Sequence, residues 1–522
     1  MKRLVMILAA VVPLSALVPV AAGSATQAVA ETAPQACSTF AVPAPAGARI
    51  ESVVAADQAA GDVTFPAAPP FPAPQPVPGV PAHCDVTVTL THGTDHVKVK
   101  VLLPTQDWNN RFQAVGGGAY YAGDFTTKLY AGVKNGYAVA TTDGGLGPSP
   151  IIPSWALTSA GSVDKTLLTN FAYRAPHELA QVGKAVTQAY YGRAAAYNYW
   201  NGCSTGGRQG YSEAQRYPGD FDGILAASPA INWDRWAVAA AWPAVVMNAE
   251  KTYPTSCELA AFNTAAVAAC DTNDGVRDGV IDEPGKCDFA PESLVGKTVL
   301  CEGQQVTISA ADARVVRRIW DGPRGLWYGL NRGAPFGGLV SAGTTGGSTG
   351  APFIVADSWI KFWLQQNPQY DTKMIGYAEF VKLFLQSRVQ YNQVIGTDNP
   401  DLSAFKRAGG KLLSWHGGND ELVFQQGTVD YRKRVERTVG GDVNSFYRLF
   451  LAPGAQHCGG GVGPAPTDPL AALVSWVEQG KAPKTLPAAT ADGATRNLCA
   501  YPLTARYTGQ GDPKQAANFV CR

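Results

Sequence analysis

The chain has 522 residues, of which 46% are hydrophobic and 10% aromatic, and its formal net charge is +1. This length and apolar content predict a large globular protein with a substantial core and two domains. A net charge so close to zero gives no indication of a nucleic-acid partner or of binding to an anionic membrane surface.

The N-terminus predicts a signal peptide over residues 1–30. Lys2 and Arg3 precede an apolar run from Leu4 to Val20, and Ala28-Val29-Ala30 offers a cleavage site of small residues. The run is too short, and too rich in alanine and proline, to favour a membrane anchor. We therefore expect a secreted protein whose ten cysteines can form five disulfides, although their spacing alone does not fix the connectivity.

Strand-like and helix-like patterns alternate along the remaining chain. A helical pattern covers Pro176 to Tyr191. The predicted strands are His96 to Leu103, Arg111 to Val115, Tyr137 to Thr142, Ala194 to Trp200, Gly223 to Ala227, Lys411 to Trp415 and Phe446 to Leu451. This alternation predicts an α/β fold, with a mostly parallel sheet and helices on its faces.

The interval 231–398 interrupts this alternation with an acidic loop, glycine-rich stretches and many aromatic residues. Its position suits a lid domain inserted into a catalytic domain made of residues 31–230 and 399–522. Its aromatic side chains could stack on a planar substrate, although most such residues fill cores. They are Trp320, Trp327, Tyr328, Phe336, Trp359, Phe362, Trp363 and Tyr370.

A nucleophile motif follows the fourth predicted strand. Gly202-Cys203-Ser204-Thr205-Gly206 reads as Gly-x-Ser-x-Gly on a strand-to-helix turn, the nucleophile elbow of an α/β-hydrolase. The glycines permit a tight turn and a close approach of the backbone to the substrate. In a chain with 56 glycines this spacing can also arise by chance, so the motif needs partners.

A base and an orienting carboxylate must follow the serine in the order Ser, Asp, His. Of the six histidines, only His416 and His457 lie after Ser204. Asp420 follows the strand Lys411 to Trp415, where a triad acid belongs, although an ordinary turn aspartate is the alternative. If Asp420 is the acid, His457 is the one histidine that can be the base.

Two cysteines adjoin these candidates, because Cys203 precedes Ser204 and Cys458 follows His457. A disulfide between them would hold the nucleophile turn against the histidine loop, whereas two buried free thiols are the alternative. With this arrangement the chain resembles the tannase and feruloyl esterase family, which is marked by Cys-Ser, Asp and His-Cys with the cysteines bridged. The resemblance extends over nearly all of the mature chain, including Leu103-Pro104, Trp108-Asn109, Gly116-Gly117-Gly118 and Asp401-Leu402-Ser403-Ala404-Phe405.

The resemblance implies an α/β-hydrolase fold with a large lid, a serine esterase activity and a set of disulfides. The implied pairs are Cys203 with Cys458, Cys270 with Cys287, Cys37 with Cys84 and Cys499 with Cys521, leaving Cys257 with Cys301. This last pair departs from the usual family pattern.

Residues 271–282 combine carboxylates with glycines on a turning backbone, which suits Ca²⁺, an ion that takes six to eight oxygen ligands. The spacing is not that of an EF-hand, and a solvated acidic turn is the alternative. The resemblance implies a structural Ca²⁺ held by the side chains of Asp271, Asp274 and Asp278 and the carbonyls of Val276 and Val280.

An oxyanion hole needs two backbone N–H groups. The candidates are the N–H of Thr205, which follows the nucleophile, and one from Gly117 or Gly118 after an early strand. The glycine run departs from the family pattern at Ala119 and Tyr120, which leaves the choice of glycine open.

We expect an esterase that cleaves aromatic carboxylic esters through an acyl-enzyme, with Ser204, His457 and Asp420 as its triad. Feruloyl and related hydroxycinnamoyl esters of plant cell walls, free or attached to polysaccharide, are the first choice of substrate. Galloyl esters, as in tannase, come second and the terephthalate monoester third. A binding protein that keeps the hydrolase fold without turnover is the alternative from another class.

Overall fold

The computed structural model describes residues 35–38, 40–67, 72–340 and 349–522. The predicted signal peptide, residues 1–30, lies outside this part of the chain. Within the described residues, no helix combines the length and the apolar character needed to span a membrane.

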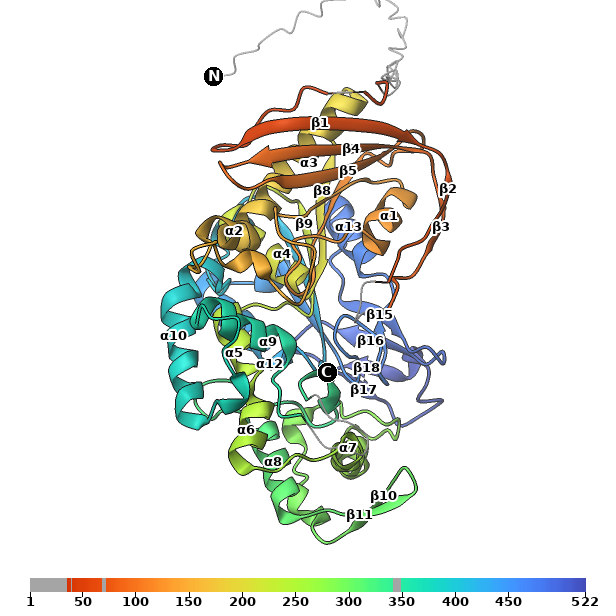
Figure 1. Cartoon of the computed structure of the whole chain (residues 1–522). Coiled ribbons are helices and arrows are strands. Elements are labelled where there is room, and N and C mark those ends of the chain that lie inside the picture. The colour runs from red at the N-terminus through yellow and green to blue at the C-terminus, as the bar shows by residue number, and fades with distance from the viewer. Residues whose placement is uncertain (1–34, 39, 68–71, 341–348) are drawn as a thin grey trace, which may run out of the picture. The chain divides into compact units, whose positions relative to one another are not determined.

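One large sheet organises the described chain (Figure 1). In spatial order its strands are β1 (Arg49–Gln58), β4 (His83–Thr91), β5 (Val97–Pro104), β7 (Ala138–Thr142), β6 (Arg111–Val115), β8 (Tyr197–Cys203), β9 (Gly223–Ala227), β12 (Lys411–Gly417) and β13 (Tyr447–Ala452). Strands β1, β4, β5 and β7 pair antiparallel, whereas every pairing from β7 to β13 is parallel. The parallel strands are almost entirely buried, so helices must cover both faces.

Helices cover both faces of this sheet, and β6 shows how. Phe112 and Ala114 of β6 lie in one hydrophobic cluster, whereas Val115 lies in another, because successive strand residues point to opposite faces. The first cluster includes residues of α3 (Ala175–Tyr191), α4 (Thr205–Arg216) and α12 (Gln425–Val439). The second includes residues of α1 (Thr127–Lys134) and α13 (Pro469–Gln479). The sheet and its two helical layers confirm the predicted α/β-hydrolase fold.

The strand that leads to the nucleophile differs from its prediction. The sequence predicts Ala194 to Trp200, whereas β8 spans Tyr197–Cys203. The strand continues through Asn201 and Gly202 because both pair with β9, so a dipeptide typical of turns is held extended by its neighbour. By contrast, β6 and β9 begin and end where the sequence predicts.

The interval 231–398 is largely helical. Its helices are α5 (Trp233–Ala239), α6 (Trp242–Glu250), α7 (Ser256–Cys270), α8 (Ala310–Asp321), α9 (Ile354–Trp359) and α10 (Tyr377–Ile395), which gather in the lower half of Figure 1. They share one hydrophobic cluster with Tyr120 and Phe171, which lie outside the interval. The described residues accordingly form one compact unit.

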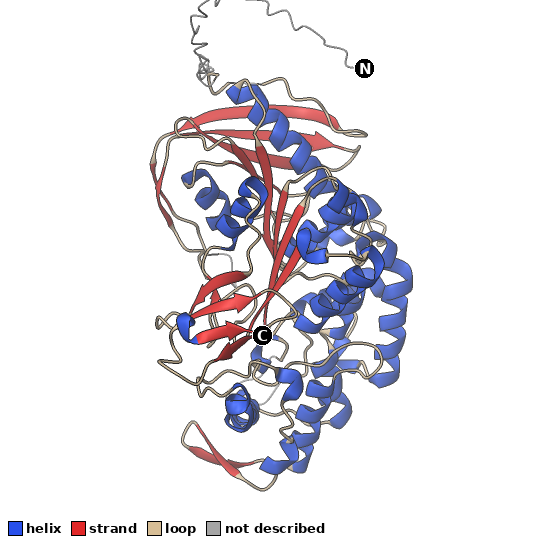
Figure 2. Ribbon diagram, turned by 180° about the vertical axis from the view of Figure 1, so that it is seen from behind, coloured by secondary structure: helices blue, strands red, loops and turns tan. Residues whose placement is uncertain are grey.

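The remaining elements are short. They are α2 (Lys165–Thr169), α11 (Ser403–Arg407), the hairpins β2 (Gly61–Val63) with β3 (Val77–Val80) and β10 (Thr298–Cys301) with β11 (Gln304–Thr307), and, toward the C-terminus, β14 (Ala465–Pro466), β15 (Thr485–Ala489), β16 (Thr495–Cys499), β17 (Ala505–Tyr507) and β18 (Phe519–Cys521). Figure 2 shows the strands of the large sheet running between helices on either side.

Candidate active site

Ser204 forms the turn between β8 and α4 by itself, since β8 ends at Cys203 and α4 begins at Thr205. Its backbone has φ 61° and ψ −121°, a strained conformation for a residue with a side chain. Gly202 and Gly206 allow this turn, because a Cβ on Gly202 would lie 2.3 Å from the carbonyl oxygen of Gly206. The serine is partly exposed, as a nucleophile must be.

The predicted acid and base are hydrogen-bonded to each other. Asp420 lies in the turn after β12, and His457 lies in the loop after the neighbouring strand β13. His457 Nδ1 is 2.8 Å from Asp420 Oδ2, and the Asp420 side chain is fully buried. The other oxygen of Asp420 accepts hydrogen bonds from the backbone N–H groups of Leu422 and Val423. The carboxylate is therefore fixed in position and satisfied as an anion.

His416 is a second histidine on the same carboxylate, which the sequence analysis did not assign to the site. Its Nε2 lies 3.1 Å from Asp420 Oδ2 and 2.8 Å from the carbonyl oxygen of Val423. Both partners are acceptors, so Nε2 carries a proton, and Nδ1 lies 2.9 Å from the hydroxyl oxygen of Thr428. His416 thus donates a hydrogen bond that holds the acid. It lies near the end of β12, four residues before Asp420.

These contacts set the protonation of the pair. Burial alone would raise the pKa of Asp420, but the charge of His457 and the hydrogen bonds from His416 and His457 hold that pKa well below its ordinary value. Burial would lower the pKa of His457, but the Asp420 carboxylate outweighs burial and raises it. Such a histidine can take a proton from a neighbouring hydroxyl and return it.

The Gly116-Gly117-Gly118 run lies against the start of α4. Both polar groups of the Gly117 backbone are already hydrogen-bonded. Its N–H donates to Gln209 Oε1 at 3.0 Å, and its carbonyl accepts from the N–H of Gly206 at 2.8 Å. A Cβ built on Gly118 would meet no atom within 4 Å, so this residue borders open space. Of the two predicted glycines, Gly118 is the better placed to offer an N–H to a ligand.

All five implied disulfides are present in the structure. Cys203 and Cys458 are bridged with their Cα atoms 5.9 Å apart, which links the residue before Ser204 to the residue after His457. The other bridges are Cys37–Cys84, Cys257–Cys301, Cys270–Cys287 and Cys499–Cys521. The pair that departs from the family pattern, Cys257 with Cys301, is among them.

In the predicted calcium loop, the carboxylates mostly bind backbone. Asp271 accepts from the N–H groups of Asp278 and Gly279, and Asp278 pairs with Arg496 at 3.0 Å. Asp274 Oδ2 is buried without a partner, an unmet need that a cation would satisfy. Burial and the neighbouring Asp274 raise the pKa of Asp282 to about 8. The loop therefore fits a cation in charge and chemistry.

The three predicted carboxylate ligands are nevertheless not gathered around one point. In the described chain, the one group of three metal-ligating side chains within 4.8 Å of one another is His177, Glu213 and Asp220. Binding of an ion by the loop would have to draw Asp271, Asp274 and Asp278 closer together.

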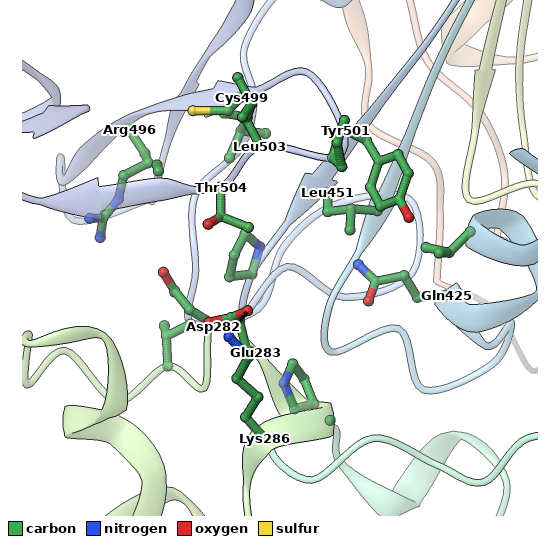
Figure 3. Close-up of a pocket in the computed structure, with 18 of the residues that line it drawn as sticks. Asp282, Glu283, Lys286, Gln425, Leu451, Arg496, Cys499, Tyr501, Leu503 and Thr504 are labelled. Carbon is green, nitrogen blue, oxygen red and sulfur yellow. Dashed lines mark ion pairs between the residues drawn. The ribbon is translucent and has the colours of Figure 1, made fainter. Parts of the chain in front are cut away.

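A cavity of about 440 Å³ lies beside this loop (Figure 3). Asp282, Glu283 and Lys286 line one side, and Arg496 and Tyr501 of the C-terminal segment line another. None of the three triad candidates lines it. This cavity is therefore a feature of the junction between the acidic loop and the C-terminal segment, separate from the candidate active site.

The aromatic residues of the interval 231–398 mostly fill the core. Five of the eight that could contact a substrate are buried: Trp320, Phe336, Trp359, Phe362 and Trp363. Trp363 stacks on Tyr120 with ring centroids 5.3 Å apart. Only Trp327, Tyr328 and Tyr370 are partly accessible.

Comparison with known proteins agrees with this geometry. Residues 84–522 match the family described as tannase and feruloyl esterase. A probable feruloyl esterase of Arthroderma benhamiae is 45% identical over 505 residues, covering 93% of each chain, and the mono(2-hydroxyethyl) terephthalate hydrolase of Piscinibacter sakaiensis is 29% identical, covering 86% of each. The structure of the tannin acyl hydrolase from Aspergillus niger superposes with a TM-score of 0.80 at 28% identity, covering 92% of this chain and 93% of that one. The chain therefore belongs to the tannase and feruloyl esterase family of carboxylic ester hydrolases.

Proposed function

We propose that the protein is a secreted serine esterase that hydrolyses feruloyl and related hydroxycinnamoyl esters through an acyl-enzyme. One observation carries the catalytic assignment. The Cys203–Cys458 bridge links the strained Ser204 turn to the loop of His457, which is hydrogen-bonded to Asp420, and this arrangement supports Ser204, His457 and Asp420 as the triad. The five disulfides support an oxidising compartment.

In this mechanism, Ser204 Oγ attacks the ester carbonyl carbon while His457 takes the hydroxyl proton. His457 then gives that proton to the departing alcohol, which leaves an acyl group on Ser204. A water molecule, deprotonated by His457, then attacks the acyl carbonyl carbon. The bond from this carbon to Ser204 Oγ breaks, His457 returns the proton to Oγ, and the acid is released. The N–H groups of Thr205 and Gly118 would bind the oxyanion in both steps. Asp420 keeps the imidazole oriented and stabilises its charged form.

Residues 331–338 support the proposed lid role of the interval 231–398. Asn331 Nδ2 donates to the carbonyl of Gly418 at 2.8 Å, and the side-chain amide of Asn419 donates to the carbonyl of Gly333. A Cβ on Gly338 would lie 2.5 Å from Cγ of Glu421. The interval therefore packs directly on the turn that carries Asp420, as a lid over the site would.

The relative at 45% identity supports hydroxycinnamoyl esters as the substrate class. The decisive experiment compares kcat/KM for methyl ferulate, methyl gallate and mono(2-hydroxyethyl) terephthalate with the purified enzyme. We expect methyl ferulate to be hydrolysed best. A clear preference for gallate or for the terephthalate monoester would replace this substrate assignment. The absence of any hydrolysis would favour the binding protein instead.

The pH dependence of kcat/KM should report the pKa of His457. A general base works in its neutral form, so kcat/KM rises as the pH rises through this pKa. Asp420 raises the pKa, so we expect the midpoint of the acidic limb above about 6.5, the ordinary value for histidine. Rates on a chromogenic aromatic ester between about pH 5 and 8 give this midpoint. Asp420→Asn should move it down, since burial then lowers the pKa with only the weaker effect of Glu421 raising it, whereas a wild-type midpoint below the ordinary value would contradict the assignment.

We further propose that the loop 271–280 binds a structural Ca²⁺ through Asp271, Asp274, Asp278 and the carbonyls of Val276 and Val280. The partnerless Asp274 oxygen supports this assignment. The ion would supply positive charge to a crowded group of carboxylates. The Cys270–Cys287 bridge closes the segment that holds them, so the role is structural rather than catalytic.

Chelation with EGTA should lower the Tm of the enzyme, because an ion bound only by the folded loop stabilises the native state by mass action. Activity at low temperature should change less than the Tm. Asp274→Asn should abolish the response to EGTA, whereas Asp288→Asn, an exposed residue outside the loop, should keep it. If EGTA left the wild-type Tm unchanged and elemental analysis found no calcium, the proposed calcium site would be wrong.

A further inference from the structure

A cluster of metal-ligating side chains lies at the C-terminal end of α4, the helix that follows Ser204. It contains none of the residues assigned so far. His177 belongs to α3, Glu213 to the last turns of α4, and Asp220 to the segment between α4 and β9. Each offers one ligand atom, and these atoms all lie within 4.8 Å of one another. Ligands of one ion in a tetrahedral site, each about 2 Å from it, fall within this separation.

The Glu213 carboxylate of this cluster lacks hydrogen-bond partners. Its side chain is completely buried, and neither carboxylate oxygen has a hydrogen-bond partner. An isolated carboxylate in such a place is strongly disfavoured, so a proton or a cation must accompany it. The carboxylate of Asp220 lies beside that of Glu213, so two acids face each other at this place.

The other two ligands are already oriented. His177 Nδ1 lies 2.5 Å from Asp220 Oδ2, while the amide of Gln181 lies 2.9 Å from Nε2, and the ring stacks on Tyr217 with centroids 3.6 Å apart. Lys184 Nζ lies 3.6 Å from the other carboxylate oxygen, Asp220 Oδ1. The Gln181 amide nitrogen lies on Nε2, so an ion bound through Nδ1 would require this amide to turn its oxygen toward the Nε2–H, the kind of partner that metal-binding histidines use.

We propose that His177, Glu213 and Asp220 bind a divalent ion of the zinc class. The ion would replace the proton shared by His177 Nδ1 and Asp220 Oδ2, with a small separation of the two groups, and would accept the unpartnered carboxylate of Glu213. One imidazole and two carboxylates suit Zn²⁺ or Co²⁺, whereas Ca²⁺ prefers oxygen ligands alone. The ion would join α3 to the C-terminal end of α4, where positive charge is also favoured by the helix dipole. This site is independent of the esterase assignment.

Zinc retention tests the site. The chelated enzyme is returned to saturating Ca²⁺, loaded with Zn²⁺, dialysed, and assayed for bound zinc and for Tm. The wild type should keep about one Zn²⁺ per chain, and its Tm should rise. Glu213→Gln and His177→Ala should show neither the bound zinc nor the rise in Tm. His96→Ala is the matched control, because His96 also pairs with a carboxylate, that of Glu51 at 2.7 Å, but on the exposed surface. It should bind zinc as the wild type does.

Co²⁺ offers a second readout that needs no variant. Wild-type enzyme loaded with Co²⁺ should show the visible absorption of a histidine-ligated ion, and added Zn²⁺ should remove it. Equal zinc retention in wild type and Glu213→Gln, or no retention and no cobalt spectrum in the wild type, would overturn the proposal. A proton shared by Glu213 and Asp220 would then be the occupant.

Discussion

Ser204→Ala should lower kcat/KM for an aromatic ester by more than about 10⁴-fold, since loss of a triad member typically removes several orders of magnitude in rate. The change deletes only the hydroxyl oxygen that attacks the carbonyl. The fold should remain, because the helix caps, the disulfide at Cys203 and the strained backbone do not depend on this oxygen. Single-turnover and steady-state rates on the same substrate measure the effect.

An exposed serine provides the control for this result. Ser162 lies on the surface, where its hydroxyl is 3.0 Å from that of Thr158, so Ser162→Ala should keep full activity. The thermal unfolding of both variants should match that of the wild type. Residual activity of Ser204→Ala above about a tenth of the wild-type value would require another nucleophile.

The core of the fold was predictable where burial on both faces leaves a continuous apolar run, as in β9. Strand β1 was not predicted, because it is an edge strand with most residues exposed, and its short apolar run Val53 to Ala56 does not alternate with polar residues as a half-buried strand does. Strand β4 was also missed, although Val86, Val88 and Leu90 alternate with more exposed residues as a half-buried strand requires.

The order of residues along the chain predicted the Asp420–His457 pair better than it predicted the other contacts of Asp420. Asp420 and His457 follow from the order Ser, Asp, His and from their position after strands. The bond from His416 to Asp420 does not, because it depends on how the turn of 417–424 folds back on the end of β12. The aromatic residues show the same limit, since burial of Trp359 and Trp363 is set by packing of distant segments.

Replacing both Cys203 and Cys458 with alanine should lower kcat by about 10²-fold, the effect expected when reacting groups are misplaced by about 1 Å. Ser204 and His457 lie on separate loops, and the bridge joins the residues directly beside them. Four other disulfides and the large core should keep the chain folded, although loss of a native bridge typically costs about 2–5 kcal/mol of stability. Activity should therefore suffer at temperatures where the fold is intact.

The comparison with a second bridge separates geometry from stability. Cys257–Cys301 lies within the interval 231–398, and no triad residue is next to it in sequence. Its double alanine variant should also have a lower Tm, but its kcat should stay near the wild-type value at a temperature well below unfolding. In the Cys203/Cys458 variant, KM should change less than kcat, because the bridge governs proton transfer between Ser204 and His457 rather than substrate contacts. Full kcat in that folded variant, or free thiols at both positions in the active wild-type enzyme, would show that the bridge does not set the catalytic distance.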